Sequence, residues 1–144
     1  MRIVVQRVIE SNVKVDGKVV GKCGKGMMLL VSFTQTDTEK EIDYMVNKVS
    51  NLRIFDDENG IMNLSIKDVG GEILSISQFT LYGDASKGNR PSYIKALNGE
   101  EAKVLYDLFN KKMNEVVHTE TGVFGADMKV SLINDGPITI LLEK

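Results

Sequence analysis

The first third of the chain has the composition of β-strands. Residues 2–9 are rich in Val and Ile, and residues 12–22 continue with valines on both sides of an Asp-Gly pair at 16–17, a strong signal for a tight hairpin. The apolar run of residues 27–33, MMLLVSF, is short enough for a strand buried on both faces, although periodicity alone does not exclude a helix. We therefore expect antiparallel sheet followed by a central strand.

Two later segments have the three- and four-residue spacing of amphipathic helices. Over residues 38–52 apolar positions recur at that spacing, and Thr38 and Glu41 are placed as a capping box. A second helix follows Asn98, which stands three positions before Glu101, as an N-cap stands before an N3 residue. The apolar side of this second helix consists of Ala102, Leu105, Tyr106, Phe109 and Met113.

The remaining segments indicate strands, turns and one long loop. Residues 53–71 suggest short extended pieces joined by tight turns, and the alternation in residues 72–82 predicts one strand that ends in polar residues. Residues 83–98 have no period that could bury a face, so they are expected to form a long basic loop. Two strands separated by a turn at residues 134–137, Asn-Asp-Gly-Pro, finish the chain.

This order of elements predicts one α/β domain over residues 1–144. Its sheet is expected to be antiparallel or mixed, or closed into a barrel, with the two main helices packed on it. A chain of 144 residues is long enough to bury a core without disulfides or a structural metal. No repeat or linker-like tract divides it.

Charge and cysteine content narrow the partners and the compartment. A formal net charge of -2 argues against broad neutralisation of phosphates, so any RNA contact has to be local. The single cysteine, Cys23, cannot form an internal disulfide, which is typical of a reducing compartment, and the charged residues 1–10 hold no signal-peptide core. We expect a cytoplasmic protein with no membrane contact.

Residues for side-chain catalysis are few. The only histidine is His118, and no nucleophile-elbow sequence is present, so a Cys23–His118 dyad is a weak hypothesis and the thiol is expected to be inert. Neither CxxC nor HExxH occurs, and no glycine-rich phosphate loop matches a known pattern. The sequence therefore predicts no metal and no cofactor.

Two short segments combine polar and conformationally special residues. Residues 77–81, Ser-Gln-Phe-Thr-Leu, place two hydroxyls and an amide at a strand end beside a loop, where a ligand could approach. Residues 135–137, Asp-Gly-Pro, indicate a hairpin turn, and a cis bond there has a low prior because only about 5–6% of X–Pro bonds in folded proteins are cis. Apart from these two features and the basic loop, the residues alone indicate no functional site.

The same segments carry a family resemblance that covers the whole chain. Residues 77–81 match the SQxTL motif, and residues 136–139 match the GPxT motif, of the bacterial and eukaryotic D-aminoacyl-tRNA deacylase family. Residues 6–8, 90–92 and 121–128 agree as well. The resemblance implies an enzyme that hydrolyses the ester between a D-amino acid and the acceptor end of tRNA.

What the resemblance implies for selectivity involves two subunits. The family forms homodimers, and its active sites would lie at the subunit interface, with the Gly136-Pro137 peptide in cis and inserted into the partner's pocket. Two backbone carbonyls held there would hydrogen-bond the α-amino group and exclude an L side chain, so that selectivity comes from rejection. Glycine has no side chain to exclude, so activity on glycyl-tRNA, including glycine mischarged on alanine tRNA, is also expected.

For the chemistry, the resemblance points to the backbone N–H groups around Phe79 and Thr80 as an oxyanion hole. We rank attack by a water, oriented by the site or by the terminal 2′-hydroxyl of the tRNA, above attack by the Thr80 hydroxyl. Ser77 and Gln78 would shape the pocket, and Arg7 would brace the partner's Gly-Pro loop.

The resemblance also suggests contacts to the tRNA. Phe124 and Met128 would pack near the terminal adenosine, and Ala102 would keep the entrance small. The basic residues of the loop either meet phosphates of the acceptor stem or are solvated surface charges; they are Lys87, Arg90 and Lys95.

Two rival hypotheses remain open. One is a non-catalytic RNA- or DNA-binding module on the same fold, against which the two intact motifs count; DNA is not an expected partner. The other is a relative specialised for glycine or another small substrate, which the same pocket could serve.

Overall fold

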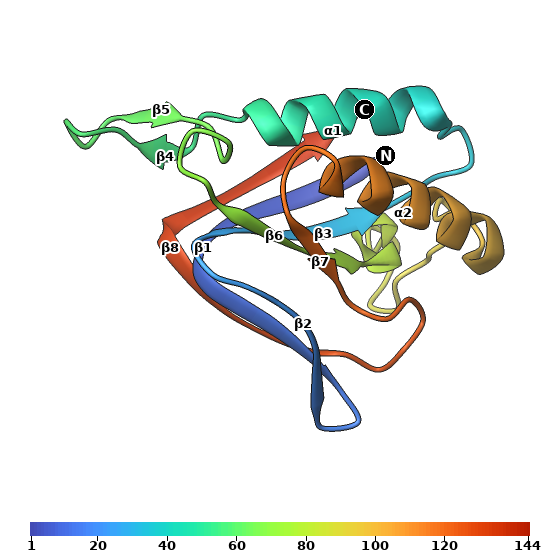
Figure 1. Cartoon of the computed structure of the whole chain (residues 1–144). Coiled ribbons are helices and arrows are strands. Elements are labelled where there is room, and N and C mark those ends of the chain that lie inside the picture. Colours follow the sequence, from blue (N-terminus) through green and yellow to red (C-terminus); the bar gives the residue numbers. More distant parts are fainter.

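The computed structural model describes residues 1–144 as a strongly curved mixed sheet with two long helices on one face (Figure 1). In chain order the elements are β1 (Arg2–Val15), β2 (Lys18–Cys23), β3 (Gly26–Ser32), α1 (Glu39–Asn51), β4 (Phe55–Asp56), β5 (Met62–Leu64), β6 (Glu72–Ser77), the 3₁₀ helix η1 (Phe79–Tyr82), α2 (Gly99–Asn114), β7 (Thr119–Thr121) and β8 (Lys129–Glu143). No helix is long and apolar enough to cross a membrane.

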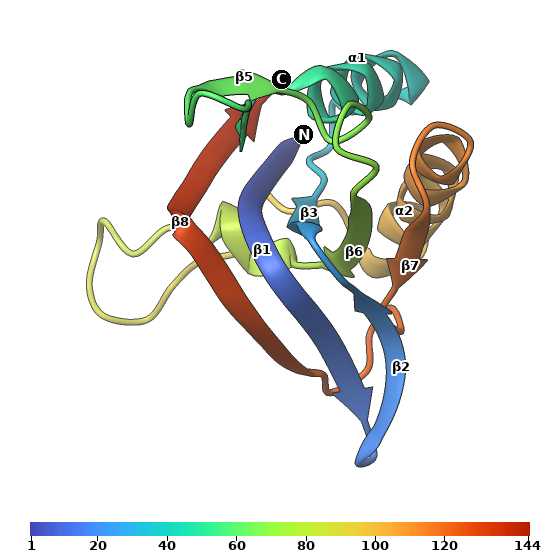
Figure 2. The same ribbon diagram turned by 60° about the vertical axis from the view of Figure 1, so that its left-hand side comes forward.

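The sheet is organised around β1, which has neighbours along both of its edges. One edge pairs antiparallel with β3 over residues 2–8 and with β2 over residues 11–15, and the other edge pairs antiparallel with β8. Beyond β3 the sheet continues with β6 and β7, both parallel to their neighbours. The sheet is therefore mixed, as expected. Its curvature brings β2 close to β7, as Figure 2 shows.

The expected hairpin at Asp16-Gly17 is present. Both residues have positive φ, 49° and 76°, which matches the backbone of a two-residue turn between right-twisted strands. The strand before the turn is a single element of 14 residues, because β1 finds pairing partners along its entire length.

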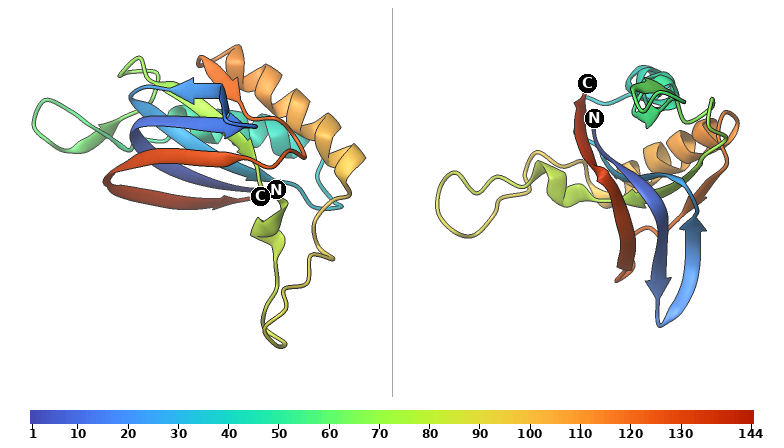
Figure 3. Two further views of the ribbon diagram at one scale, coloured as in Figure 1. Left: turned by 90° about the horizontal axis from the view of Figure 1, so that it is seen from below. Right: turned by 90° about the vertical axis from the view of Figure 1, so that its left-hand side faces the viewer.

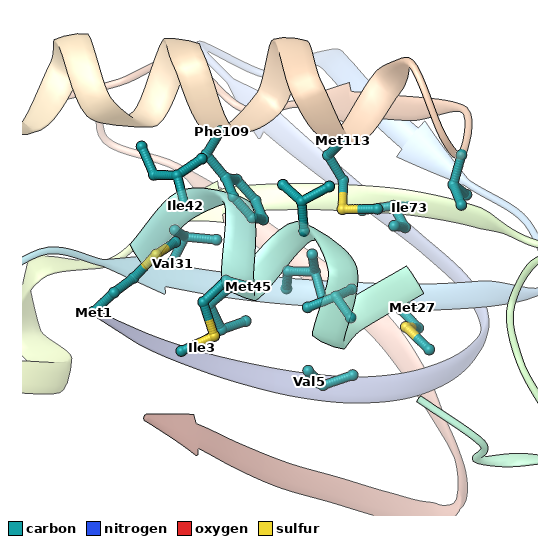
Figure 4. Close-up of a cluster of buried hydrophobic side chains, with 14 of the residues drawn as sticks. Met1, Ile3, Val5, Met27, Val31, Ile42, Met45, Ile73, Phe109 and Met113 are labelled. Atoms are coloured by element: carbon teal, nitrogen blue, oxygen red, sulfur yellow. The ribbon is translucent and has the colours of Figure 1, made fainter. Parts of the chain in front are cut away.

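The apolar run at residues 27–33 forms β3, the strand between β1 and β6. Met27, Leu29 and Val31 face the helices, while Met28 packs with Leu74 in a smaller cluster on the opposite face. Both faces of β3 are covered, which explains why its sequence does not alternate. The larger cluster, shown in Figure 4, joins the sheet to α1 and α2 through side chains such as Ile42, Met45 and Phe109.

Both helices begin where the sequence predicts. Thr38 and Glu41 form the expected capping box at α1, and the Asn98 side chain accepts a hydrogen bond from Glu101 N–H at 3.1 Å at α2. The helices are tied to each other by Lys112, which donates to Glu39 at 2.6 Å and to Asp43.

Two predicted elements were wrong in extent. The strand expected over residues 72–82 ends at Ser77, and the chain then enters η1. The turn expected at residues 134–137 does not separate two strands, because β8 runs unbroken from Lys129 to Glu143. The physical reason is that β1 offers a pairing partner on both sides of the Gly-Pro pair, so the chain forms an irregularity within one strand instead of reversing.

Candidate active site

A pocket of about 680 Å³ opens where β3 and β6 end. Its walls come from the ends of β3 and β6, the segment that leads into α2, and the loop between β7 and β8; the lining residues include 31–33, 76–79, 96–99 and 124–128. Figure 3 shows the long loop of residues 83–98 extending from the same side of the molecule. Segments far apart in the sequence therefore meet at one opening.

The SQxTL segment forms one wall of this pocket. Gln78 N–H donates to Val31 carbonyl at 2.8 Å, which extends the pairing of β6 with β3 by one residue. The chain then turns into η1, whose first N–H groups, those of Phe79 and Thr80, have no capping side chain. Ser77, Gln78 and Phe79 line the pocket, whereas Thr80 does not.

The Thr80 side chain is exposed and already has a partner. Its hydroxyl oxygen accepts a hydrogen bond from the Gln78 side-chain amide. The Phe79 ring is 57% exposed and meets the Tyr93 ring edge-on, with centroids 5.1 Å apart. Tyr93 lines the pocket too, so the predicted basic loop contributes an aromatic wall that the sequence analysis missed.

The opposite wall carries the predicted residues Phe124 and Met128. The Phe124 ring packs against Tyr106 of α2, with centroids 5.8 Å apart. Met128 packs so close to Gly122 that a Cβ added there would lie 2.5 Å from its sulfur, so a larger residue would displace the Met128 side chain. Ala102, in the first turn of α2, is buried and also lines the pocket.

The pocket contains no side chain suited to act as a general base. Its only carboxylate is that of Asp127, which is paired with Lys129 Nζ at 2.7 Å. His118 lies outside the pocket, 60% exposed and 3.7 Å from Glu120. Cys23 is buried in the smaller cluster, and burial, followed by the charge of Glu72, raises the pKa of its thiol to about 11. A Cys23–His118 dyad therefore has no support.

The GPxT segment lies on β8 and does not line this pocket. The Gly136-Pro137 peptide is cis, as the family resemblance implies, and Gly136 has a φ of +114°. The side-chain amide of Asn134 donates to the Ile138 carbonyl at 2.9 Å and to the Arg7 carbonyl at 3.0 Å, which closes a small loop around the peptide. Gly136 and Pro137 themselves are exposed.

Arg7 supports this loop from within the same chain. Its side chain is only 8% exposed; Nε pairs with Asp135 at 3.1 Å, and Nη1 donates to the Ile54 carbonyl at 2.7 Å. A second carboxylate, that of Asp56, lies 3.4 Å from Nη1. Arg7 therefore braces its own chain's Gly-Pro loop and links it to the start of β4.

The basic residues of the long loop are exposed, and they differ in their partners. Lys95 pairs with Asp84 at 3.6 Å, whereas no ion pair is present at Lys87 or Arg90. Hydrogen bonds from the Gln35 side chain to the carbonyls of Ile94, at 2.8 Å, and Ala96, at 3.2 Å, hold the end of the loop at the pocket.

Comparisons with known proteins agree over almost the whole chain. A family model described as D-Tyr-tRNA(Tyr) deacylase matches residues 4–143. Two relatives are each 57% identical to this chain, over 99% of its length and 97% of their own. They come from Kosmotoga olearia and from Clostridium botulinum (strain 657 / Type Ba4), and both are named D-aminoacyl-tRNA deacylase.

Two solved structures have the same fold. A c-Myc DNA Unwinding Element Binding Protein superposes with a TM-score of 0.95 at 40% identity, covering 100% of this chain and 99% of that one. A probable eukaryotic D-amino acid tRNA deacylase superposes with a TM-score of 0.85 at 17% identity, covering 98% and 97%, which is a likeness of fold.

Proposed function

The chain belongs to the D-Tyr-tRNA(Tyr) deacylase family and is a D-aminoacyl-tRNA deacylase, and we propose that it hydrolyses the aminoacyl ester in the pocket at the end of β6. The single observation that carries this assignment is that the SQxTL segment follows β6 at that pocket, where Phe79 lines the wall at the uncapped start of η1. A tetrahedral intermediate carries its negative charge on the former carbonyl oxygen, and such donors stabilise that charge.

Water is the proposed nucleophile. The Thr80 side chain does not line the pocket, and its hydroxyl is engaged by Gln78, which argues against direct attack by Thr80. No histidine lines the pocket, and the only carboxylate in it is paired with a lysine. The site therefore acts through backbone donors and positioning, with the terminal 2′-hydroxyl of the tRNA as the candidate group that orients the water.

Chiral selection is proposed to come from a second copy of the chain. Gly136 and Pro137 are exposed on β8, away from the pocket of their own subunit. β8 has no neighbour on its outer edge, and Ile133 and Leu141 on it are half exposed, as expected for a strand that meets a partner. In the proposed homodimer, the carbonyls of this loop enter the partner's pocket and reject L side chains.

This geometry sets the proposed substrate range. Because selection acts by rejecting an L side chain, D-amino acids of many sizes are accepted, and glycine is accepted as well. Phe124 and Met128 are placed to pack against the terminal adenosine, since aromatic rings stack on unpaired bases. Lys87 and Arg90 are proposed to contact phosphates of the acceptor stem.

The activity is tested by mixing the protein at catalytic concentration with D-Tyr-tRNA, L-Tyr-tRNA and glycyl-tRNA and following ester loss against the spontaneous rate. Rapid loss of the D and glycyl esters, with the L ester untouched, is expected. If the L ester is lost equally fast, selection by rejection is contradicted. If only glycyl-tRNA is hydrolysed, the enzyme is specialised for glycine.

Complementation tests the two-subunit site. Gly136→Val damages the loop but leaves the pocket intact, and Ala102→Trp fills the pocket but leaves the loop intact. Each variant alone is expected to hydrolyse D-Tyr-tRNA only slowly and without preference for the D ester, and dimers refolded from an equal mixture should regain about a quarter of the wild-type D-selective activity, since half are mixed and each mixed dimer has one intact site of two. No recovery would place the loop in the site of its own chain.

A further inference from the structure

Tyr106 is a buried residue that contacts two walls of the pocket without lining it. It lies on α2, is 2% exposed, and donates its hydroxyl hydrogen to the Ser75 carbonyl at 2.8 Å. Burial raises the pKa of this hydroxyl, partly offset by the hydrogen bond to Ser75, so the group stays a neutral donor at physiological pH. It makes the only side-chain hydrogen bond between α2 and β6.

The Ser75 carbonyl joins three parts of the chain at one atom. Besides the Tyr106 hydroxyl, it accepts a hydrogen bond from Gly122 N–H at 3.1 Å. A carbonyl oxygen has two lone pairs, and both are used here. The three parts are β6, which ends in the SQxTL segment; α2, which carries Ala102; and the loop that begins at Gly122 and carries Phe124 and Met128.

The Tyr106 ring supports the second wall directly. Its centroid lies 5.8 Å from that of Phe124, with the planes tilted by 46°. The hydroxyl thus holds the strand two residues before Ser77, while the ring supports the aromatic side chain across the pocket. One side chain therefore links the strand that leads into the SQxTL wall with the Phe124 wall.

We propose that Tyr106 is a positioning residue for ester hydrolysis, a role that rests on the function proposed above. It acts through Ser75 and Phe124 and touches no reacting atom. Displacement of reacting groups by about 1 Å can cost about 100-fold in rate, so even a small relaxation of this junction reaches the chemical step.

The test removes one oxygen atom. Tyr106→Phe keeps the ring and its contact with Phe124, and Tyr44→Phe, at an exposed tyrosine of α1, is the matched control. At a temperature where all forms are folded, Tyr106→Phe should lower kcat on D-Tyr-tRNA by about tenfold, with KM changed by less than about twofold. A merely structural role would lower the unfolding midpoint and leave kcat unchanged, which would overturn the proposal.

A second measurement separates this proposal from the proposed function. Amide hydrogen exchange should be faster at Gly122 and Gln78 in Tyr106→Phe than in wild type, and unchanged in Tyr44→Phe. If the wild-type protein hydrolyses no aminoacyl-tRNA, the proposed function fails. The exchange rates then decide by themselves whether Tyr106 holds the two walls of the pocket. Unchanged protection at both amides would then overturn the positioning role.

Discussion

The two signature segments of this chain differ in their surroundings: one lines a pocket and the other is exposed on a strand. The SQxTL segment lies at the end of a buried strand, in a pocket formed by four separate stretches of chain, and is proposed to act through its backbone. The GPxT segment lies exposed on β8, with no pocket around it, yet it is held by Asn134 and by the buried Arg7. An exposed loop that its own chain holds in place, but that lines no pocket there, suits the proposed action on a partner subunit.

The largest effect is expected when the exposed region is changed. In Gly136→Val, a Cβ would lie 2.9 Å from Ile138 Cγ1 and 3.2 Å from Arg7 Nη2, at a φ of +114° that valine rarely adopts. Discrimination of D- from L-Tyr-tRNA, measured as the ratio of kcat/KM, should fall more than about 100-fold.

Gly60→Val is the matched control for this change. Gly60 also has positive φ, +75°, but a Cβ there meets nothing within 4 Å, and the residue lies in the turn between β4 and β5. It carries the backbone strain without touching the loop. Full discrimination in Gly136→Val would contradict the selecting role of the GPxT segment.

The contacts of Arg7 beneath the Gly-Pro loop should contribute to the stability of the fold. Arg7→Met leaves the Ile54 carbonyl and Asp135 without their buried partner, while the exposed carboxylates regain water. We expect a loss of about 2 kcal/mol in the free energy of unfolding, measured by urea titration. The exposed Arg53→Met, which loses a 3.1 Å bond to the Asn63 carbonyl, should cost far less. Equal losses would mean that Arg7 adds nothing through its burial.

Alkaline pH should affect stability through a thiol that lies outside both signature segments. The pKa of Cys23 is about 11 in the folded chain, against 9.0 ordinarily, so above about pH 9 the unfolded chain releases this proton first. Stability present below pH 9 should then fall by at most about 1.4 kcal/mol per pH unit until the folded pKa is passed. Burial also raises the pKa of Tyr82, to about 12, and that of Tyr106, so they act only above about pH 10.

Unfolding of wild type and Cys23→Ala between about pH 8 and 10 isolates the thiol. The variant should show a shallower decline over this interval. Identical slopes would mean that the thiol ionises as easily in the folded chain as in the unfolded one.

The smallest effect is expected at the hydroxyl nearest the proposed oxyanion hole. Thr80→Ala removes a side chain that does not line the pocket and leaves the backbone N–H in place. Deacylation of D-Tyr-tRNA should stay within about threefold of wild type, because an uncharged hydroxyl outside the pocket contributes little to the transition state. Complete loss of turnover with tRNA binding intact would instead identify Thr80 as the nucleophile.

Local signals in the sequence predicted the local elements well. The capping residues Thr38 and Asn98 begin helices where expected, and Asp16-Gly17 forms the expected turn, because each effect depends on neighbouring residues. The SQxTL segment and Phe124, Met128 and Ala102 also come together in the pocket, although this grouping came from the family resemblance rather than from residue spacing.

Long-range pairing decided the rest. The Gly-Pro pair at residues 136–137 has the composition of a turn, but β1 pairs with the strand before and after it, and this tertiary partner overrides the local preference. The part played by Tyr93 was also invisible, because its contact with Phe79 depends on how the basic loop folds back onto η1. Tyr106 appeared only as one apolar position among five, and its hydroxyl bond needs the distance to Ser75.

The pairing of the first strand with the last has a consequence for biosynthesis. Arg2 of β1 lies opposite Glu143 of β8, and β8 covers one whole edge of β1. A ribosome delivers β1 first and must translate through β8 before that edge is satisfied, so the nascent chain carries an open, Val- and Ile-rich edge throughout its synthesis. Completion of the sheet, and with it a supported Gly-Pro loop, is therefore a step that follows chain elongation, and co-translational chaperones that shield strand edges would have their longest opportunity to act on residues 2–15.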